Sequence, residues 1–591
     1  MTDAIAHRGP DGEGFRINAS NNVGFGHRRL AILDLSDAGQ QPMHYLDRYS
    51  ITYNGELYNY IELKEALQQK GYSFRTQTDT EVLLAAYDCW KEQCLQQFDG
   101  MFAFAIWDEQ EQTIFTARDR FGEKPFYYFF DGEQFLFGSE MKALWAANAP
   151  KTINQTMLLN YLGLGWVKNP VDLSQTFYEN IRCLPQAHYL KLNMRDGHNE
   201  IVQYWDLDKE TISSQTEAEA VEQFQHLLRT SVKRRLRSDV EVGTSLSGGL
   251  DSSSIAAMIK QLQSTNHQLQ TFTASFPGFE KDETAYAKEV ANYLQLQQLF
   301  VTPTAETLLT DIEQLIFHQE EPFQSSSIYA QYKVYQLAKL HGIKVILDGQ
   351  GADETLAGYH KYIHWFLQEK IRESSVVSRE LKAFADHDIN VDWSWKNKLA
   401  ARFPEIAAVQ LESKANAALK NNPFINPAFL KAHYNKKTIF KPVVNKLNDL
   451  LYFNTMQFGL EELLRYADRN SMAHGVEVRL PFLSHELVQF VFSLPSQYKL
   501  QKGFTKYLLR QSMQQHLPST IVYRTDKIGY EPPQQQWMQT TAFNELLQLS
   551  RQKLVKAEIL KQSVLHQPVN AQAAHAVNND DWRYFCAAHL L

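Results

Sequence analysis

The chain has 591 residues, of which 44% are hydrophobic and 21% are charged, with a formal net charge of −8. This length predicts two or more domains, because one hydrophobic core rarely serves so many residues. The acidic balance offers no positive field for nucleic acid, and no apolar run approaches the length of a membrane span. The first eight residues lack the apolar segment of a signal peptide. Four scattered cysteines, Cys89, Cys94, Cys183 and Cys586, suit a reducing cytoplasm, where we expect the protein to reside.

Short aromatic-rich runs of alternating polarity dominate the N-terminal third. Residues 102–107 and 126–130 predict β-strands, and helical periodicity covers 61–70 and 81–90. Stacked sheets covered by helices fit this pattern. The strand signals stop near Asp206, and a polar stretch suited to a linker follows. We therefore expect one domain over 1–207 and a second over 208–591.

Strand and helix signals alternate in the second domain. Thr216 and Glu219 predict a capping box at the start of a helix. Strands are then expected near 240–246, 271–276 and 344–347, with a helix at 283–294. This alternation predicts a parallel sheet with helices on both faces. Residues 370–447 are polar and helical, and the sequence does not indicate what they contact.

The segment Ser245-Leu246-Ser247-Gly248-Gly249-Leu250-Asp251-Ser252-Ser253 connects the first of these strands to a helix predicted at 254–262. A glycine-rich turn at a helix N-terminus directs backbone N–H groups at an anion, and the serine hydroxyls add donors. Asp251 adds a carboxylate of the kind that Mg²⁺ requires. The segment contains no lysine, unlike the phosphate loop of kinases and GTPases. The alternative is an ordinary serine-rich turn that caps a helix.

A second glycine-rich segment, Asp348-Gly349-Gln350-Gly351-Ala352-Asp353-Glu354, follows the strand at 344–347. Ligands of open parallel sheets lie beyond the carboxyl ends of the strands, so this segment is expected to face the first one. Three carboxylates this close repel one another unless a cation is present. Mg²⁺ held between Asp251 and Asp353 is one reading, and a solvated acidic turn is the other.

Two later segments are rich in charge. Arg465-Tyr466-Ala467-Asp468-Arg469-Asn470-Ser471-Met472 alternates opposite charges, and it is either a structural ion network or part of a site. Lys527 is a candidate cation for a departing phosphate, against the simpler reading of a surface lysine.

Together, and in this order, these segments resemble the synthetase half of the glutamine-dependent asparagine synthetases. The resemblance implies an α/β parallel-sheet domain of the ATP-pyrophosphatase type with extra helices. In that family a substrate carboxylate attacks the α-phosphate of ATP, and ammonia then displaces AMP from the acyl-adenylate. By this resemblance the ATP-binding residues are Leu246, Ser247, Gly248, Gly249, Asp251, Ser252, Ser253, Ala274, Gly349 and Gln350. The implied catalytic residues are Lys527, Gln350 and Asp353, and the implied metal ligands are Asp251 and Asp353.

One residue departs from the family pattern. The best-known members have a glutamate where Gln350 stands, and that glutamate is linked to forming the adenylate or to deprotonating the amine. A glutamine side chain cannot act as a base. That role therefore passes to Glu354 or to water, or is dispensed with.

The N-terminal third resembles the class II glutamine amidotransferase domain of the same family. The matching segments are His7-Arg8-Gly9-Pro10-Asp11-Gly12, Arg29-Leu30-Ala31-Ile32-Leu33-Asp34, Asn54-Gly55-Glu56-Leu57-Tyr58-Asn59, Thr78-Asp79-Thr80-Glu81 and Ala117-Arg118-Asp119-Arg120-Phe121-Gly122. The implied fold is an α+β, four-layer αββα glutaminase of the Ntn type. By resemblance Arg29 and Asp79 would hold the α-carboxylate and α-amine of glutamine, while Asn54 and Gly55 would form the oxyanion hole. Glu56, Leu30 and Ile32 complete the implied glutamine-binding set.

The family's domain begins with Cys-Gly-Ile, and the thiol and free α-amine of that cysteine do the chemistry. Residues 1–6 hold no cysteine, so we expect the first strand and the nucleophile of the domain to lie outside this chain. Free ammonia is then the expected nitrogen source of the chain as given. A start placed too late and a real loss of activity both explain this; the retained Arg29, Asn54, Gly55 and Asp79 favour the former.

The sequence thus predicts an AMP-forming ligase that uses ATP and Mg²⁺ to convert aspartate to asparagine, with glutamine or ammonia as the nitrogen source. Two alternatives stay open: an amidotransferase of the same build that acts on another carboxylate, and a catalytically silent nucleotide-binding scaffold. A homodimer is compatible with the sequence, which does not fix the oligomeric state.

Overall fold

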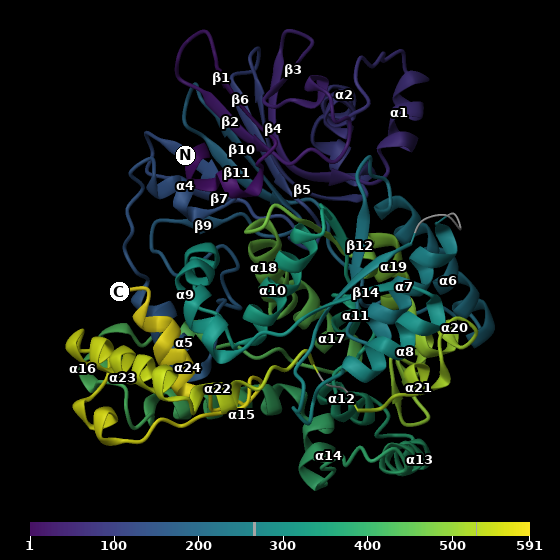
Figure 1. Cartoon of the computed structure of the whole chain (residues 1–591), viewed down its shortest axis with the longest axis vertical. Helices are drawn as coiled ribbons and strands as arrows, with labels where there is room; N and C mark the ends of the chain where they lie inside the picture. Colours follow the sequence, from purple (N-terminus) through teal and green to yellow (C-terminus); the bar gives the residue numbers. More distant parts are fainter. Residues whose placement is uncertain (264–267, 527–528) are drawn as a thin grey trace.

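A computed structural model describes residues 1–263, 268–526 and 529–591, and its sheets fall into an N-terminal and a C-terminal group (Figure 1). The N-terminal strands are β1 (Gly12–Ile17), β2 (Gly24–Arg29), β3 (Met43–Tyr45), β4 (Tyr49–Leu57), β5 (Gly100–Asp108), β6 (Thr113–Arg118), β7 (Tyr127–Phe130), β8 (Phe135–Gly138), β9 (Arg182–Cys183), β10 (His188–Asn193) and β11 (Asn199–Gln203). The helices among them are α1 (Tyr60–Gln68), α2 (Asp79–Trp90), α3 (Cys94–Gln97), α4 (Met141–Trp145) and α5 (Gln155–Leu164).

The N-terminal strands build stacked sheets between helices. A six-stranded antiparallel sheet has the order β11-β10-β6-β5-β4-β3. One of its faces packs against α1 and α2, where Ile51 and Tyr53 meet Leu83 and Leu84. Its other face packs against the strand pair β1-β2 and the sheet β8-β7-β9, and α4 lies against β7 and β8. The predicted αββα layering and the helices predicted at 61–70 and 81–90 are confirmed.

The C-terminal group is built on a parallel sheet. Its strands are β12 (Val242–Ser245), β13 (Gln270–Ala274), β14 (Gln297–Val301), β15 (Val345–Leu347) and β16 (Glu477–Arg479), followed by the small hairpin β17 (Leu500–Gln501) and β18 (Phe504–Thr505). The helices are α6 (Glu217–Arg235), α7 (Leu250–Leu262), α8 (Thr284–Leu294), α9 (Ala305–Gln319), α10 (Ser327–Leu340), α11 (Ala352–Thr355), α12 (Lys361–Glu369), α13 (Ser374–Ala385), α14 (Trp395–Arg402), α15 (Pro404–Lys420), α16 (Pro427–His433), α17 (Leu447–Tyr452), α18 (Leu460–Met472), α19 (His485–Ser493), α20 (Tyr507–Met513), α21 (Ser519–Val522), α22 (Gln534–Met538), α23 (Thr541–Lys556) and α24 (Asp580–Ala588).

The order of the parallel sheet is β14-β13-β12-β15-β16. After β12 the chain first builds outward through β13 and β14, and it then returns to place β15 and β16 on the other side. The strand order therefore reverses between β12 and β15, and ligands of such sheets bind in the crevice at this point. Val345 and Leu347 join the core with α6, α7 and α8, whereas Ile346 joins the core with α10, α12 and α18. Helices therefore cover both faces, as predicted.

The two groups share a continuous core. The largest core cluster combines Tyr161 and Phe177 of the N-terminal part with Phe323, Trp582 and Phe585 of the C-terminal part. Helix α5 packs against α15 and α24. The segment between β11 and α6 has no regular secondary structure, and α6 begins with the predicted capping box of Thr216 and Glu219. The division at 207 remains a prediction, since side chains pack across it.

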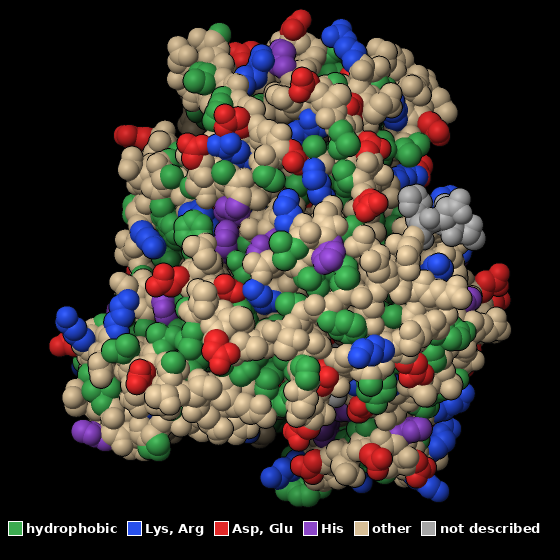
Figure 2. All heavy atoms as spheres, in the orientation of Figure 1, with side chains coloured by type: hydrophobic (Ala, Val, Ile, Leu, Met, Phe, Trp, Pro, Cys, Tyr) green, Lys and Arg blue, Asp and Glu red, His purple; other side chains and the backbone are tan. Residues whose placement is uncertain are grey.

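Among the described residues, the helices are all too short or too polar to cross a membrane. Figure 2 shows acidic and basic side chains interspersed over one face of the molecule. The four cysteines are free thiols, and Cys94, Cys183 and Cys586 are buried.

Candidate active site

A cavity of about 840 Å³ lies at the carboxyl ends of β12 and β15, where the strand order reverses. We call it the synthetase cavity. Both glycine-rich segments contribute to its wall, which includes Leu246, Ser247, Gly249, Asp251, Ser252, Gly349, Gln350 and Asp353. The structure thus brings together most of the residues predicted to bind ATP, and their role in binding it remains a prediction.

The first segment forms a tight turn into α7. Gly248 has a φ of +80°, and a Cβ there would lie 2.4 Å from the backbone nitrogen of Ala287, so only glycine fits. The amide of Gly249 donates to Ser247 Oγ at 3.2 Å, and the amide of Ser247 donates to Ser252 Oγ at 3.2 Å. Helix α7 begins at Leu250 without a side-chain cap, so its first N–H groups remain available to an anion.

Two predicted metal ligands converge on a lysine that sequence analysis did not identify. Lys506 Nζ lies 2.5 Å from Asp251 Oδ2 and 2.6 Å from Asp353 Oδ1. These carboxylates hold the pKa of Lys506 above its usual value, against the opposing effect of burial. Asp251 Oδ1 is buried and has no hydrogen-bond partner among the described residues. The two carboxylates therefore suit a shared cation.

Lys506 could not be found by motif. It follows the hairpin β17-β18, more than 250 residues after Asp251, and it adopts a left-handed φ of +51°. Arg510 and Arg524 also line the synthetase cavity and were not identified. Arg510 donates to three backbone carbonyls, and Arg524 pairs with Glu283 at 2.8 Å.

Some predicted ATP-binding residues lie elsewhere. Helix α7 starts four residues earlier than the predicted 254, so Ser253 falls in its first turn and its fully buried side chain faces the core. Ser253 is absent from the described lining of the synthetase cavity, and its role in binding ATP remains a prediction. Gly248 and Ala274 are likewise absent from the described lining, where Phe272 stands beside Leu246. Lys527 lies outside the described residues.

Gln350 and Glu354 occupy different environments. Gln350 lines the synthetase cavity, and its Oε1 has no hydrogen-bond partner among the described residues. Glu354 is buried behind the wall and accepts a hydrogen bond of 2.6 Å from the hydroxyl of Tyr359. Tyr359 lines the cavity, so its hydroxyl group connects the buried Glu354 carboxylate to the cavity.

A second cavity, of about 230 Å³, lies in the N-terminal group, and we call it the glutaminase cavity. The structure places every residue of the predicted glutamine-binding set around it: Arg29, Leu30, Ile32, Asn54, Gly55, Glu56 and Asp79. Met472 and Glu477 of the C-terminal group also line it.

The acids of the glutaminase cavity are buried and interact with one another. Asp79 Oδ2 accepts hydrogen bonds from the Tyr53 hydroxyl at 2.9 Å and from the Leu57 amide at 2.8 Å. Burial nevertheless raises the pKa of Asp79 to about 6. Burial also raises the pKa of Glu56, which lies 3.4 Å from Arg479 of β16.

The guanidinium of Arg29 donates hydrogen bonds to backbone carbonyls and is not available to a carboxylate in this conformation. Nη1 donates to the carbonyl of Ser36 at 2.7 Å, and Nη2 donates to the carbonyls of Leu33 and Asp34. Asn54 Nδ2 donates to Ser139 Oγ at 3.2 Å. To bind the α-carboxylate of glutamine, the Arg29 guanidinium would have to leave these carbonyl groups. Its role in binding glutamine remains a prediction.

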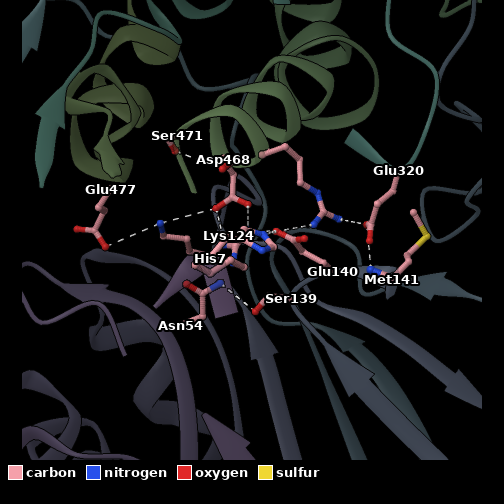
Figure 3. A network of polar contacts seen from close by, with 12 residues as sticks. His7, Asn54, Lys124, Ser139, Glu140, Met141, Glu320, Asp468, Ser471 and Glu477 are labelled. Carbon is pink, nitrogen blue, oxygen red and sulfur yellow. Dashed lines mark hydrogen bonds and ion pairs between the residues drawn. The ribbon is translucent and has the colours of Figure 1, made fainter. Parts of the chain in front are cut away.

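The charge-rich segment at 465–472 lies on α18 and forms a buried ion network between the two groups (Figure 3). Arg8 donates to both carboxylate oxygens of Asp468, at 2.8 and 2.9 Å. Arg469 pairs with Glu320 at 2.7 Å and with Glu140 at 3.2 Å. Of the two readings left open by the sequence, the structural ion network is confirmed for these residues.

The comparisons with known proteins agree with this geometry. A family model described as asparagine synthase matches residues 223–589, and one described as a glutamine amidotransferase domain matches residues 1–205. A Bacillus subtilis (strain 168) protein named asparagine synthetase [glutamine-hydrolyzing] 1 is 30% identical over 96% of this chain and 88% of its own length. Asparagine synthetase [glutamine-hydrolyzing] 3 of the same organism is 32% identical over 89% of this chain and 82% of its own. A putative asparagine synthetase [glutamine-hydrolyzing] 2 of Methanocaldococcus jannaschii is 37% identical over 63% of this chain and 74% of its own. The chain therefore belongs to the glutamine-hydrolysing asparagine synthetase family.

Proposed function

We propose that this protein makes asparagine from aspartate, with ATP cleaved to AMP and pyrophosphate and with nitrogen drawn from glutamine or ammonia. The observation that carries the proposal is the meeting of both glycine-rich segments and Lys506 around one cavity at the point where the strand order reverses. Family membership supports the same reaction.

In the first step a side-chain carboxylate oxygen of aspartate bonds to the α-phosphorus of ATP, and the bond to the bridging oxygen breaks to release pyrophosphate. We assign the pyrophosphate to the turn formed by Ser247, Gly249 and Ser252, where N–H and O–H donors converge. Lys506, together with Lys527 as expected from the sequence, balances the charge that accumulates there.

Mg²⁺ is the cation proposed for Asp251 and Asp353. Their carboxylates share one ammonium, and Asp251 keeps a buried oxygen that has no hydrogen-bond partner in the described ranges, so the donor set fits a hard cation. When bound, the ion would neutralise charge on the phosphates.

In the second step ammonia attacks the acyl carbon, and the carbon–oxygen bond to AMP breaks. Gln350 cannot take up the proton that the nitrogen loses. We propose that the Tyr359 hydroxyl accepts it while passing its own proton to Glu354, to which it is hydrogen-bonded at 2.6 Å. The glutaminase cavity is the proposed glutamine site, with Asp79 facing the α-amine and Asn54 and Gly55 facing the amide carbonyl.

The test is ATP–pyrophosphate exchange with a panel of carboxylic acids, followed by amide formation with ammonium and, separately, with glutamine. With ammonium as the nitrogen source, the rate of amide formation is measured independently of glutamine hydrolysis. We expect aspartate to support exchange and to yield asparagine and AMP in equal amounts. Exchange with a different acid alone would establish the alternative amidotransferase, and no AMP with any acid would establish the silent scaffold.

A further inference from the structure

Lys361 is a cation of the synthetase cavity that has no part in the proposed handling of the phosphates and, unlike Arg524 with Glu283, no ion pair among the described residues. Lys506 contacts Asp251 and Asp353, and Arg510 is bound to backbone carbonyls. Lys361 instead lines the wall together with Tyr359, Leu463 and Tyr466. These residues belong to α12, to α18 and to the segment that precedes α12, whereas the phosphate-binding turn lies between β12 and α7.

In the described part of the chain, the ammonium of Lys361 forms no ion pair with a carboxylate. Among the residues that the structure describes, its hydrogen bonds and ion pairs amount to one contact, a 3.3 Å hydrogen bond to the neutral Asn454 Oδ1. It also lies over the rings of Tyr359 and Tyr362, 5.0 and 5.3 Å from their centroids. Lys361 is an exposed residue where it borders the cavity, and the protein packed around its ammonium lowers its pKa. A partly desolvated cation of this kind favours an anionic ligand.

The nearest carboxylates have other partners. Asp353 pairs with Lys506 at 2.6 Å, Glu354 accepts from Tyr359 at 2.6 Å, and Glu462 accepts from Tyr466 at 2.9 Å. Burial lowers the pKa of Lys361, and the charges of these three carboxylates oppose that effect. Helix α12 begins at Lys361 without a side-chain cap hydrogen bond, and its dipole adds positive potential at the same place.

We propose that Lys361 binds the carboxylate of the acyl substrate that does not react, so that the enzyme selects acids carrying a second free carboxylate. The inference rests on the proposed function and adds to it a binding site for this second charge. Adenylation removes the charge of the reacting carboxylate only, whereas the other remains anionic through both steps. A cation on the wall formed by α12 and α18 would hold that end of the substrate and direct the reacting carboxylate toward the α-phosphate.

The experiment compares L-aspartate with its α-amide, in which the second carboxylate is replaced by a neutral group of similar size. ATP–pyrophosphate exchange is measured for the wild type, Lys361→Met, Lys361→Arg and the control Lys441→Met. Lys441 is the control because it is a half-buried lysine whose pKa is lowered by burial and by the charge of Lys361, and because it is absent from the described lining of the cavity. It lies 5.0 Å from the centroid of the Trp166 ring.

We expect the wild type to prefer aspartate over the α-amide by at least about tenfold in kcat/KM, the equivalent of one charge-assisted hydrogen bond. Lys361→Met should lose about that factor with aspartate and little with the α-amide, so that the preference disappears. Lys361→Arg should retain part of it, Lys441→Met should retain all of it, and KM for ATP should stay unchanged in each variant.

Three results would overturn the inference. Equal losses of Lys361→Met on both substrates would mean that Lys361 supports the fold or the nucleotide instead. The same collapse of preference in Lys441→Met would assign the effect to general electrostatics. Absence of exchange with every carboxylate in the wild type would refute the proposed function itself, and that failure is distinct because it appears before any variant is compared.

Discussion

Gly358 lies beside Asp353 and Lys506 of the synthetase cavity, where a side chain would overlap with both residues. A Cβ there would lie 1.8 Å from Asp353 Oδ1 and 2.2 Å from Lys506 Cε. Both atoms belong to flexible side chains, so the backbone can remain in place. The ion pair between Lys506 and Asp353, however, would have to move. We predict that Gly358→Ala lowers ammonium-dependent asparagine formation by about tenfold or more, while the free energy of unfolding changes by less than about 1 kcal/mol.

Gly12→Ala is the control for this prediction, because its added Cβ would meet only Arg29 Cβ at an ordinary 3.7 Å. Turnover and denaturant unfolding are measured on both variants. A Gly358→Ala enzyme with the wild-type rate would show that the position of the Lys506 ion pair does not matter for catalysis.

The raised pKa of Asp79 predicts that the affinity for glutamine depends on pH. Burial raises its pKa to about 6, and only the ionised carboxylate attracts the α-ammonium group of glutamine. Affinity should therefore be full above pH 7 and should fall as the pH drops through 6, reaching about one tenth at pH 5. Calorimetric titration with glutamine at several pH values tests this. Asp79→Asn should bind weakly with a flat profile; flat binding by the wild type would remove Asp79 from the amine site.

At the scale of elements, α18 carries both the ion network and part of each cavity wall. Leu463 and Tyr466 line the synthetase cavity, and Met472 lines the glutaminase cavity. Between them Asp468 receives two hydrogen bonds from Arg8, and both residues are buried. The helix therefore fixes the two cavities relative to each other through paired buried charges.

We predict that Asp468→Asn destabilises the protein by about 3 kcal/mol, because the buried guanidinium of Arg8 loses its bidentate partner. The matched control is Asp172→Asn, which removes a half-exposed pair with Arg182 at 2.9 Å and should cost no more than about 1 kcal/mol. Thermal and denaturant unfolding supply both values. Equal effects of the two substitutions would show that burial of the Asp468 pair does not matter for stability.

The same elements show what the sequence could predict. Polarity patterns and turn residues located α1, α2, α8 and the strands that precede the two glycine-rich segments, because those signals are local. The start of α7 was placed four residues too late, because the glycine-rich turn hides the first turn of the helix from a periodicity signal. Lys506 and Lys361 were missed because their importance arises from packing between segments far apart in the sequence.

At the scale of the whole molecule, two cavities with different chemistry share one chain and one continuous core. Core packing joins α5 of the N-terminal group to α15 and α24 of the C-terminal group. The buried pair of Arg479 with Glu56 places a strand of the parallel sheet against the acids of the glutaminase cavity. The overall architecture thus matches a ligase that uses nitrogen from its own amidotransferase domain, as the family description implies.

The most direct test of the central claim follows one oxygen atom. Aspartate labelled with ¹⁸O in its side-chain carboxylate is incubated with ATP, Mg²⁺ and ammonium, and the AMP and pyrophosphate are analysed by mass spectrometry. An acyl-adenylate requires the attacking carboxylate oxygen to remain on phosphorus when the amide forms, so each AMP should carry one ¹⁸O and the pyrophosphate none. Asparagine formed alongside unlabelled AMP, or alongside ADP and labelled phosphate, would contradict the proposed reaction.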